Sequence, residues 1–227
     1  MEKLRLWELK KKIMLILPLG MIIVALMIFL PAGSSNYWQG WLFLATLFIP
    51  FLFVVAYLLK HDPELLERRM RTKEKEAGEK TMIRLTQLLF FIGFLIPGFD
   101  YRYGWSNVPT WLVILSDIIM FLGYMVVFSV FRENTYTSRI VEVEKNQKVI
   151  STGPYSFVRH PMYAGTLLMY IFLPLALGSY FALIPMIPVM FVVIIRIFDE
   201  ERLLSKELKG YKEYCKKVKY RLVPGIW

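Results

Sequence analysis

Residues 37–59 read YWQGWLFLATLFIPFLFVVAYLL, a stretch without a charged side chain. A helix rises about 1.5 Å per residue, so this stretch is long enough to cross the roughly 30 Å hydrocarbon layer of a bilayer. Inside that layer backbone polar groups have no water to bind, and an α-helix satisfies them internally. Residues 37–59 therefore predict a transmembrane helix.

Other apolar runs, separated by charged segments, repeat this pattern along the chain. The chain is 56% hydrophobic with a mean hydropathy of +0.47, which is too apolar for a soluble domain. The last two runs are short, contain prolines and are joined at Gly178-Ser179, which indicates a tight helical hairpin that crosses tilted or incompletely. We predict an all-α polytopic membrane protein of about six transmembrane helices, the further runs being Ile13–Leu30, Thr81–Phe99, Trp111–Phe131, Met162–Leu177 and Tyr180–Ile195.

The basic residues fall almost entirely on one set of connections. Segments 1–12, 60–84, 132–159 and 196–227 hold 27 of the 28 Lys and Arg residues, and the other connections hold only Arg102. Because cytoplasmic loops of membrane proteins carry the excess of Lys and Arg, both termini and these segments are predicted to be cytoplasmic, at the cell membrane. The net charge of +10 is then an orientation signal, and no nucleic-acid partner is expected.

The two parts of the chain differ in kind. We predict one domain over residues 1–227, with four transmembrane helices in 1–131 and the chemistry concentrated in 132–227. The first apolar run lacks a small-residue cleavage site and is followed at once by another span, so it is interpreted as a retained helix. A short interfacial helix is expected from Pro63, and a charged C-terminal helix over about 199–217.

Few residues are available for a metal site or a disulfide. The chain has two histidines, His61 and His160, and one cysteine, Cys215, so neither a transition-metal site nor an internal disulfide is expected. Asp117 is the one ionisable residue well inside a span. It is either a functional carboxylate, a helix–helix hydrogen-bonding partner of a Ser or Tyr, or a residue close to the membrane face.

The run Gly153-Pro-Tyr-Ser-Phe-Val-Arg-His-Pro-Met-Tyr-Ala-Gly165 precedes the hairpin. Pro161 suits the first turn of a helix, which places His160 at the helix start, where free backbone N–H groups favour an anion. A ligand carboxylate could be held there by these groups, His160 and Arg159, with Tyr163 at the rim. The alternative is that Arg, His and Tyr anchor a membrane boundary.

A second polar cluster follows the hairpin. Arg196 and Glu200 are four residues apart, on one helical face, and form either an ion pair or a site in which Glu200 receives a ligand ammonium and Arg196 faces the acceptor. Because a two-helix hairpin returns the chain to the face it left, both clusters are expected to share one pocket. Tyr211 and Tyr214 either stack on a flat ring or pack the last helix to the body.

These residues resemble the isoprenylcysteine carboxyl methyltransferase family and, more loosely, the membrane phospholipid methyltransferases. The resemblance covers roughly 134–227 and rests on Gly153-x-Tyr155-x-x-x-Arg159-His160-Pro161-x-Tyr163-x-Gly165, then Arg196-x-x-x-Glu200-Glu201, with Gly210, Tyr214, Arg221 and Pro224 beyond.

By this resemblance the cofactor is S-adenosyl-L-methionine, bound in a cytoplasmic pocket, and the partner is a lipophilic methyl acceptor from the bilayer beside other membrane lipids. Arg196 is then the residue on the acceptor. The implied cofactor-binding residues are Gln147, Lys148, Val149, Ile150, Tyr155, Arg159, His160, Pro161, Met162, Tyr163 and Glu200.

A carboxylate acceptor needs no general base, whereas an amine acceptor must lose a proton, to Glu201 or Tyr163. An isoprenylcysteine-type carboxylate is favoured over a phospholipid or another small lipid. The alternative from another enzyme class is an NADPH-dependent membrane reductase of the sterol-reductase type, in which Arg139, Lys145 and Lys148 would bind the 2′-phosphate. A non-enzymatic scaffold would predict broken motif positions, and these are all filled.

Overall fold

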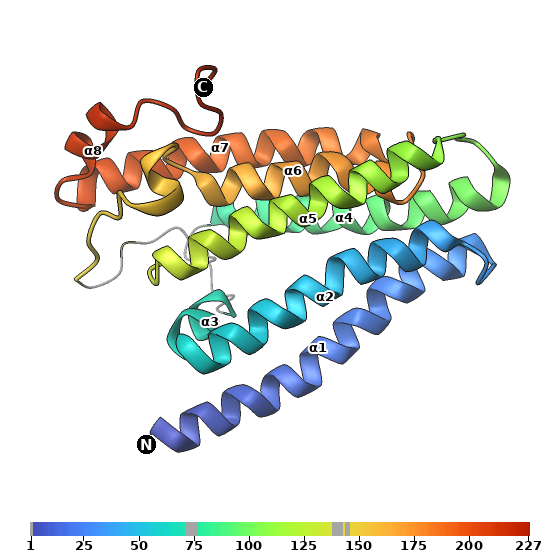
Figure 1. Ribbon diagram of the computed structural model, residues 1–227, viewed down its shortest axis with the longest axis horizontal. Helices are drawn as coiled ribbons and strands as arrows, with labels where there is room; N and C mark the ends of the chain where they lie inside the picture. Colours follow the sequence, from blue (N-terminus) through green and yellow to red (C-terminus); the bar gives the residue numbers. More distant parts are fainter. Residues whose placement is uncertain (1, 71–76, 138–142, 144–145) are drawn as a thin grey trace.

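The computed structural model describes residues 2–70, 77–137, 143 and 146–227. All regular structure in these residues is helical (Figure 1). The helices are α1 (Glu2–Ala32), α2 (Trp38–His61), α3 (Pro63–Arg69), α4 (Ala77–Tyr103), α5 (Thr110–Glu133), α6 (Pro161–Ala176), α7 (Leu183–Glu207) and α8 (Tyr211–Lys217), with a 3₁₀ turn, η1, at Gly153–Ser156.

The long helices form a bundle of membrane-spanning length. In the described residues, four helices are long and apolar enough to cross a bilayer: α1 from Leu6, α2, α4 from Thr81, and α5. The apolar helix α6 is shorter, with 16 residues, and α7 has 25. Helix α6 packs along α5, and α7 packs against α6 and α4 (Figure 1). The predicted all-α polytopic membrane fold is therefore confirmed.

The connections sort to two ends of the bundle. The N-terminus, α3, residues 146–150 and α8 lie at one end, and the turns α1–α2, α4–α5 and α6–α7 lie at the other (Figure 1). This is the alternation that the distribution of basic residues predicts. Which side of the membrane each end faces stays a prediction.

The predicted C-terminal helix over 199–217 is wrong. Instead α7 continues through the charged residues to Glu207, and α8 is a separate helix from Tyr211. Between them Gly210 has a φ of 89°, in the left-handed region, which is costly for other residues and interrupts the helix. The hairpin connection is also longer than expected, because it covers residues 177–182.

Two glycines allow α5 and α6 to touch through their backbones. A Cβ atom added at Gly165 would lie 2.7 Å from the carbonyl oxygen of Gly123, and one at Gly123 equally close to that of Gly165. Small residues commonly permit such close packing between membrane helices. At Gly165 it is the α5 backbone that makes this close approach.

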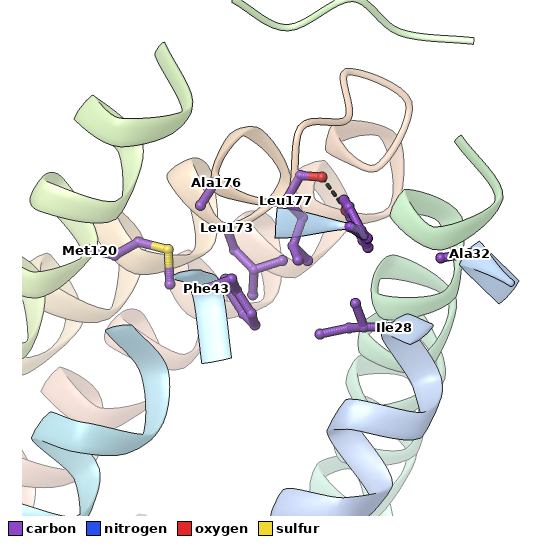
Figure 2. Close-up of a cluster of buried hydrophobic side chains, with 8 residues drawn as sticks. Ile28, Ala32, Phe43, Met120, Leu173, Ala176 and Leu177 are labelled. Carbon is purple, nitrogen blue, oxygen red and sulfur yellow. Dashed lines mark hydrogen bonds between the residues drawn. The ribbon is translucent and has the colours of Figure 1, made fainter. Parts of the chain in front are cut away.

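A buried hydrophobic cluster joins four helices at the end away from α3 and α8 (Figure 2). Phe43 of α2, Met120 of α5 and Leu173 of α6 pack together with Ile28 of α1. The Tyr37 hydroxyl donates to the backbone oxygen of Leu177, which links the α1–α2 turn to the end of α6. This cluster fixes the hairpin against the N-terminal helices.

Three smaller predictions also have outcomes. The helix α3 begins at Pro63 as predicted, where the Asp62 side chain accepts from the backbone N–H of Leu65 at 2.9 Å. Asp117 is buried on α5, where the side chain of Thr46 on α2 lies near enough to interact with it, and among the described residues no bond to a Ser or Tyr is seen. Cys215 is a free cysteine on α8.

Candidate functional site

A cavity lies where the end of α5, η1, the start of α6 and the polar half of α7 converge. Every residue predicted to bind the cofactor lines it, and so does Arg196. The lining residues are Asn134, Tyr136, Thr137, Gln147, Lys148, Val149, Ile150, Tyr155, Arg159, His160, Pro161, Met162, Tyr163, Arg196, Glu200, Leu203, Leu204, Leu208, Tyr211 and Tyr214. We call this the first cavity.

The start of α6 gives the first cavity an anion-binding corner. His160 is the N-cap residue, 4% exposed, and Pro161 is the first helical residue, as the sequence predicts. Within the described part of the chain no side chain caps this helix end. Its first N–H groups and the positive end of the helix dipole therefore favour a negatively charged group here.

Glu200 and Arg196 are joined through a tyrosine. The Tyr163 hydroxyl donates to Glu200 Oε2 at 2.7 Å and accepts from Arg196 Nε at 3.1 Å. The sequence expected either a mutual ion pair or separate roles for Arg196 and Glu200. Tyr163 instead provides a hydrogen-bonded path from the carboxylate to the guanidinium, which orients both groups.

Glu201 stands apart from the cavity lining. Its Oε1 accepts from Arg159 Nε at 2.7 Å and lies 3.2 Å from His160 Nε2, and its Oε2 accepts from Arg221 Nε at 2.9 Å. Burial would raise the pKa of Glu201, but hydrogen bonds from His160 and Arg221 and the charge of Arg159 lower it to about 2. A carboxylate so strongly held is a poor proton acceptor at neutral pH.

The C-terminal segment completes this ion-pair cluster. The backbone N–H groups of Arg159 and His160 donate to the carbonyl oxygens of Tyr220 and Arg221, both at 2.9 Å. Arg159 Nη1 also donates to the carbonyl oxygens of Val218 and Lys219. Arg159 lines the first cavity, and through these hydrogen bonds it also links the loop before α6 to the segment after α8.

Tyrosines form an aromatic wall of the first cavity. Asn134 Nδ2 donates to the Tyr155 hydroxyl at 2.9 Å, and the Tyr214 hydroxyl donates to the backbone oxygen of Tyr155 at 2.7 Å. Burial raises the pKa of Tyr155 and Tyr211, so both stay protonated. The Tyr211 hydroxyl is buried, and none of the described residues hydrogen-bonds to it.

Sequence reasoning missed part of the lining. Asn134, Tyr136 and Thr137 follow shortly after the fourth apolar run. Leu203 lies on α7 and Leu208 directly after it, in the stretch that the sequence assigned to a separate C-terminal helix. The signal for the first three was the run of hydrogen-bonding side chains at the exit of a transmembrane helix.

A second cavity adjoins the first and is larger, about 350 Å³ against about 110 Å³. It lies between α4, α6 and α7, and the end of α3 contributes Arg69. Met162, Tyr163 and Arg196 line both cavities. The other residues of the second cavity are Met82, Ile83, Thr86, Gln87, Thr166, Tyr170, Val189, Val192, Val193 and Asp199.

Residues 111–210 match the family described as phospholipid methyltransferase, which includes isoprenylcysteine carboxyl methyltransferases. The resemblance predicted from the sequence is thereby confirmed. A delta(14)-sterol reductase of Mus musculus is 28% identical to the chain over 106 residues, which cover 43% of this chain and 25% of that protein. The chain thus spans about a quarter of the length of this curated relative.

The fold and the site define a class, that of polytopic all-α membrane proteins with a polar cavity at one end of the helix bundle. Within that class, residues 111–210 match the family model of the phospholipid methyltransferases, and the activity that this similarity suggests is taken up below as a proposal. The matched segment contains α5, α6, α7 and most of the first cavity. The helices α3 and α4, which complete the second cavity, lie outside it.

Proposed function

We propose that the protein uses S-adenosyl-L-methionine to methylate a lipophilic acceptor, most favourably an isoprenylcysteine-type carboxylate and otherwise a phospholipid or another small lipid. The observation that carries this proposal is the pair of adjoining cavities. One is polar and tyrosine-lined, the other lies among apolar helices, and they share Met162, Tyr163 and Arg196. A water-soluble donor and a lipid acceptor need such a meeting point.

The first cavity fits the donor group by group. The uncapped start of α6 beside His160 suits the carboxylate of the amino-acid part, and Glu200 suits its ammonium. The buried Tyr211 hydroxyl has a hydrogen bond to give or accept, and Tyr155 and Tyr214 offer aromatic surface to a purine. These features support the full set of cofactor-binding residues predicted from the sequence.

S-adenosyl-L-methionine supplies a methyl group already activated by a sulfonium, so that a new bond from an acceptor oxygen or nitrogen to the methyl carbon replaces the bond to sulfur, which keeps the electron pair. The protein then has to align the acceptor and exclude water. Arg196, at the shared wall, orients an acceptor carboxylate. Tyr163 fixes Arg196 and Glu200 relative to each other.

We assign Glu201 a positioning role in place of the catalytic role expected from the sequence. Its contacts with Arg159, His160 and Arg221 and its low pKa support this. With a carboxylate acceptor no proton is released and no base is required. With an amine acceptor one proton must leave, and of the two bases named from the sequence only Tyr163 lines the cavities.

We further propose that both cavities face the cytoplasm, where the donor is made available. The distribution of basic residues supports this orientation, since the charged segments share the bundle end that holds the cavities. Both termini would then be cytoplasmic, in the cell membrane.

A reductase using NADPH is the second candidate, favoured by the similarity to the mouse delta(14)-sterol reductase. Of the residues proposed for its 2′-phosphate, Lys148 is an exposed residue lining the first cavity, whereas Arg139 and Lys145 lie outside the described residues. Glu200 in the same cavity would repel a phosphate and attract an ammonium, which supports the methyl donor.

The experiment that separates the two is ligand-dependent thermal unfolding of the purified protein in detergent, because a ligand stabilises the state that it binds. S-adenosyl-L-methionine is expected to raise the unfolding temperature and NADPH to leave it unchanged. The variant Glu200→Ala should lose the first effect, and Glu207→Ala, at the exposed end of the same helix, should keep it. Stabilisation by NADPH alone would overturn the proposal.

The acceptor class is tested with membranes and S-adenosyl-L-methionine radiolabelled in its methyl group. Label recovered in an isoprenoid or prenylated carboxylate supports the favoured acceptor. Label in a phospholipid points to the alternative. No label in the lipid-soluble fraction would contradict a lipophilic acceptor.

A further inference from the structure

The second cavity carries two guanidinium groups from opposite parts of the chain. Arg196 reaches it from α7, inside the matched region, and Arg69 from the end of α3, outside that region. Arg69 Nη1 lies 3.8 Å from Met162 Sδ, and its guanidinium stands over the Phe131 ring at 5.5 Å. Met162 is a residue of the wall between the two cavities.

The two arginines line the same space. Arg69 and Arg196 both belong to the wall of the second cavity, together with Tyr170 of α6. The one carboxylate in this lining, Asp199, is half-exposed and lies 3.6 Å from Arg202 Nη1. Among the described residues the cavity thus presents more positive than negative charge.

The apolar part of the second cavity comes mainly from α7. Val189, Val192 and Val193 recur at helical spacing there and form an apolar stripe. The α4 wall is mixed, with Met82 and Ile83 followed one turn later by Thr86 and Gln87. A ligand with a long apolar chain and a compact anionic end matches this distribution.

We propose that Arg69 is a specificity-determining residue, which with Arg196 selects an acceptor bearing an anionic group, a carboxylate or a phosphate. This inference rests on the proposed function, because it names the class of acceptor for the same site. Guanidinium groups bind such anions through paired, charge-assisted hydrogen bonds. Two of them repel a protonated amine, so they discriminate as well as attract.

The inference also explains why α3 belongs to the site. Arg68, the residue before Arg69 on α3, donates to the backbone oxygen of Thr135 and, at 3.4 Å, to the Thr135 hydroxyl. Asn134, which precedes Thr135, lines the first cavity. Helix α3 therefore contacts the wall of the first cavity through Arg68 and lines the second cavity through Arg69. The segment that tunes the acceptor then lies outside the region of the family match.

The test measures binding of three probes with one apolar chain to the full-length protein in nanodiscs: farnesoic acid, farnesyl monophosphate and farnesol. At least one anionic probe is expected to bind about tenfold or more tightly than the alcohol. Arg69→Gln should remove about tenfold of that preference, as one charge-assisted contact is lost, and Arg69→Lys should retain part of it. Arg84→Gln, on an exposed α4 residue outside the cavity lining, should retain all of it.

A carboxylate-only or a phosphate-only preference supports the inference and names the group. Equal binding of all three probes to the unaltered protein, or an unchanged preference in Arg69→Gln, would overturn it. An equal loss in Arg84→Gln would also overturn it, because the effect would then be one of net charge. Stabilisation of Arg69→Gln by S-adenosyl-L-methionine reports folding and the cofactor site separately, so failure of this inference is distinguishable from failure of the proposed function.

Discussion

Glu201 offers the sharpest test of the assigned roles, because its surroundings predict a stability effect with a definite pH dependence. Its side chain is 13% exposed, and the Arg159 side chain that it contacts is 8% exposed. Glu201→Gln keeps the shape and removes the charge. Arg159 and Arg221 would then lose a counter-charge that compensates for their burial.

The size of the stability effect follows from the pKa of the Glu201 carboxyl. A fall from the usual value of 4.5 to about 2 on folding corresponds to about 3 kcal/mol of stabilisation at neutral pH. Because the folded-state pKa is the lower one, this contribution is complete above about pH 5. It declines as the pH falls from 4.5 toward 2, and at about pH 3 less than half of it remains.

Equilibrium unfolding in mixed detergent micelles measures this difference. Glu201→Gln should lower the free energy of unfolding by about 3 kcal/mol at pH 7, and the gap from the unaltered protein should shrink by more than half at about pH 3. The control Glu207→Gln, on an exposed residue of the same helix, should change stability little at either pH. An equal gap at both pH values, or none, would refute the assigned cluster. A variant of normal stability that lost only methyl transfer would restore the catalytic role.

Three further outcomes follow from the structure. Gly165→Ala should destabilise the protein by about 1–3 kcal/mol, because the new Cβ would lie 2.7 Å from an α5 carbonyl oxygen. Gly20→Ala, with open space around the residue, should not, and unfolding in detergent compares the two variants. Tyr163→Phe should lower the rate of methyl transfer about tenfold while binding of S-adenosyl-L-methionine persists, because Arg196 and Glu200 lose their common partner; unchanged rates would remove Tyr163 from the mechanism. In a Cys215→Ser background, Lys212→Cys should react with a membrane-impermeant thiol reagent from the cytoplasmic side and Trp105→Cys from the other, and the reverse pattern would invert the topology.

The transmembrane architecture and the convergence of most residues of the first cavity could be predicted because both depend on local chemistry. Apolar runs of membrane length need helices, and Pro161 fixes a helix start that places His160 at its cap. The hairpin then brings Glu200 back beside Tyr163. Each of these steps uses a constraint that acts within a few residues or through one short connection.

Other features depended on contacts that no local pattern encodes. The charge-rich residues after Ile195 suggested a new helix. Charged side chains, however, are compatible with a helix once it leaves the membrane, so α7 continues to Glu207. The helix is interrupted only before Gly210, and α8 begins after it. The place of Glu201 depends on Arg221, which comes from the far side of α8. Glu200 and Glu201 are neighbours in sequence, but they point to different partners, and only the tertiary structure separates them.

The two cavities differ in how much of their lining lies inside the family match, which limits what the match can say about the function. The match covers α5 to α7, the segment that builds most of the first cavity, and the chain is also similar over part of its length to a sterol reductase. A shared helical scaffold does not fix the chemistry, which depends on the residues in the site. The walls of the second cavity come partly from α3 and α4, outside the match, so the acceptor cannot be transferred from relatives. It has to be inferred from Arg69 and from the α4 residues that line the second cavity, and these are the residues whose substitution should change the acceptor while leaving the donor in place.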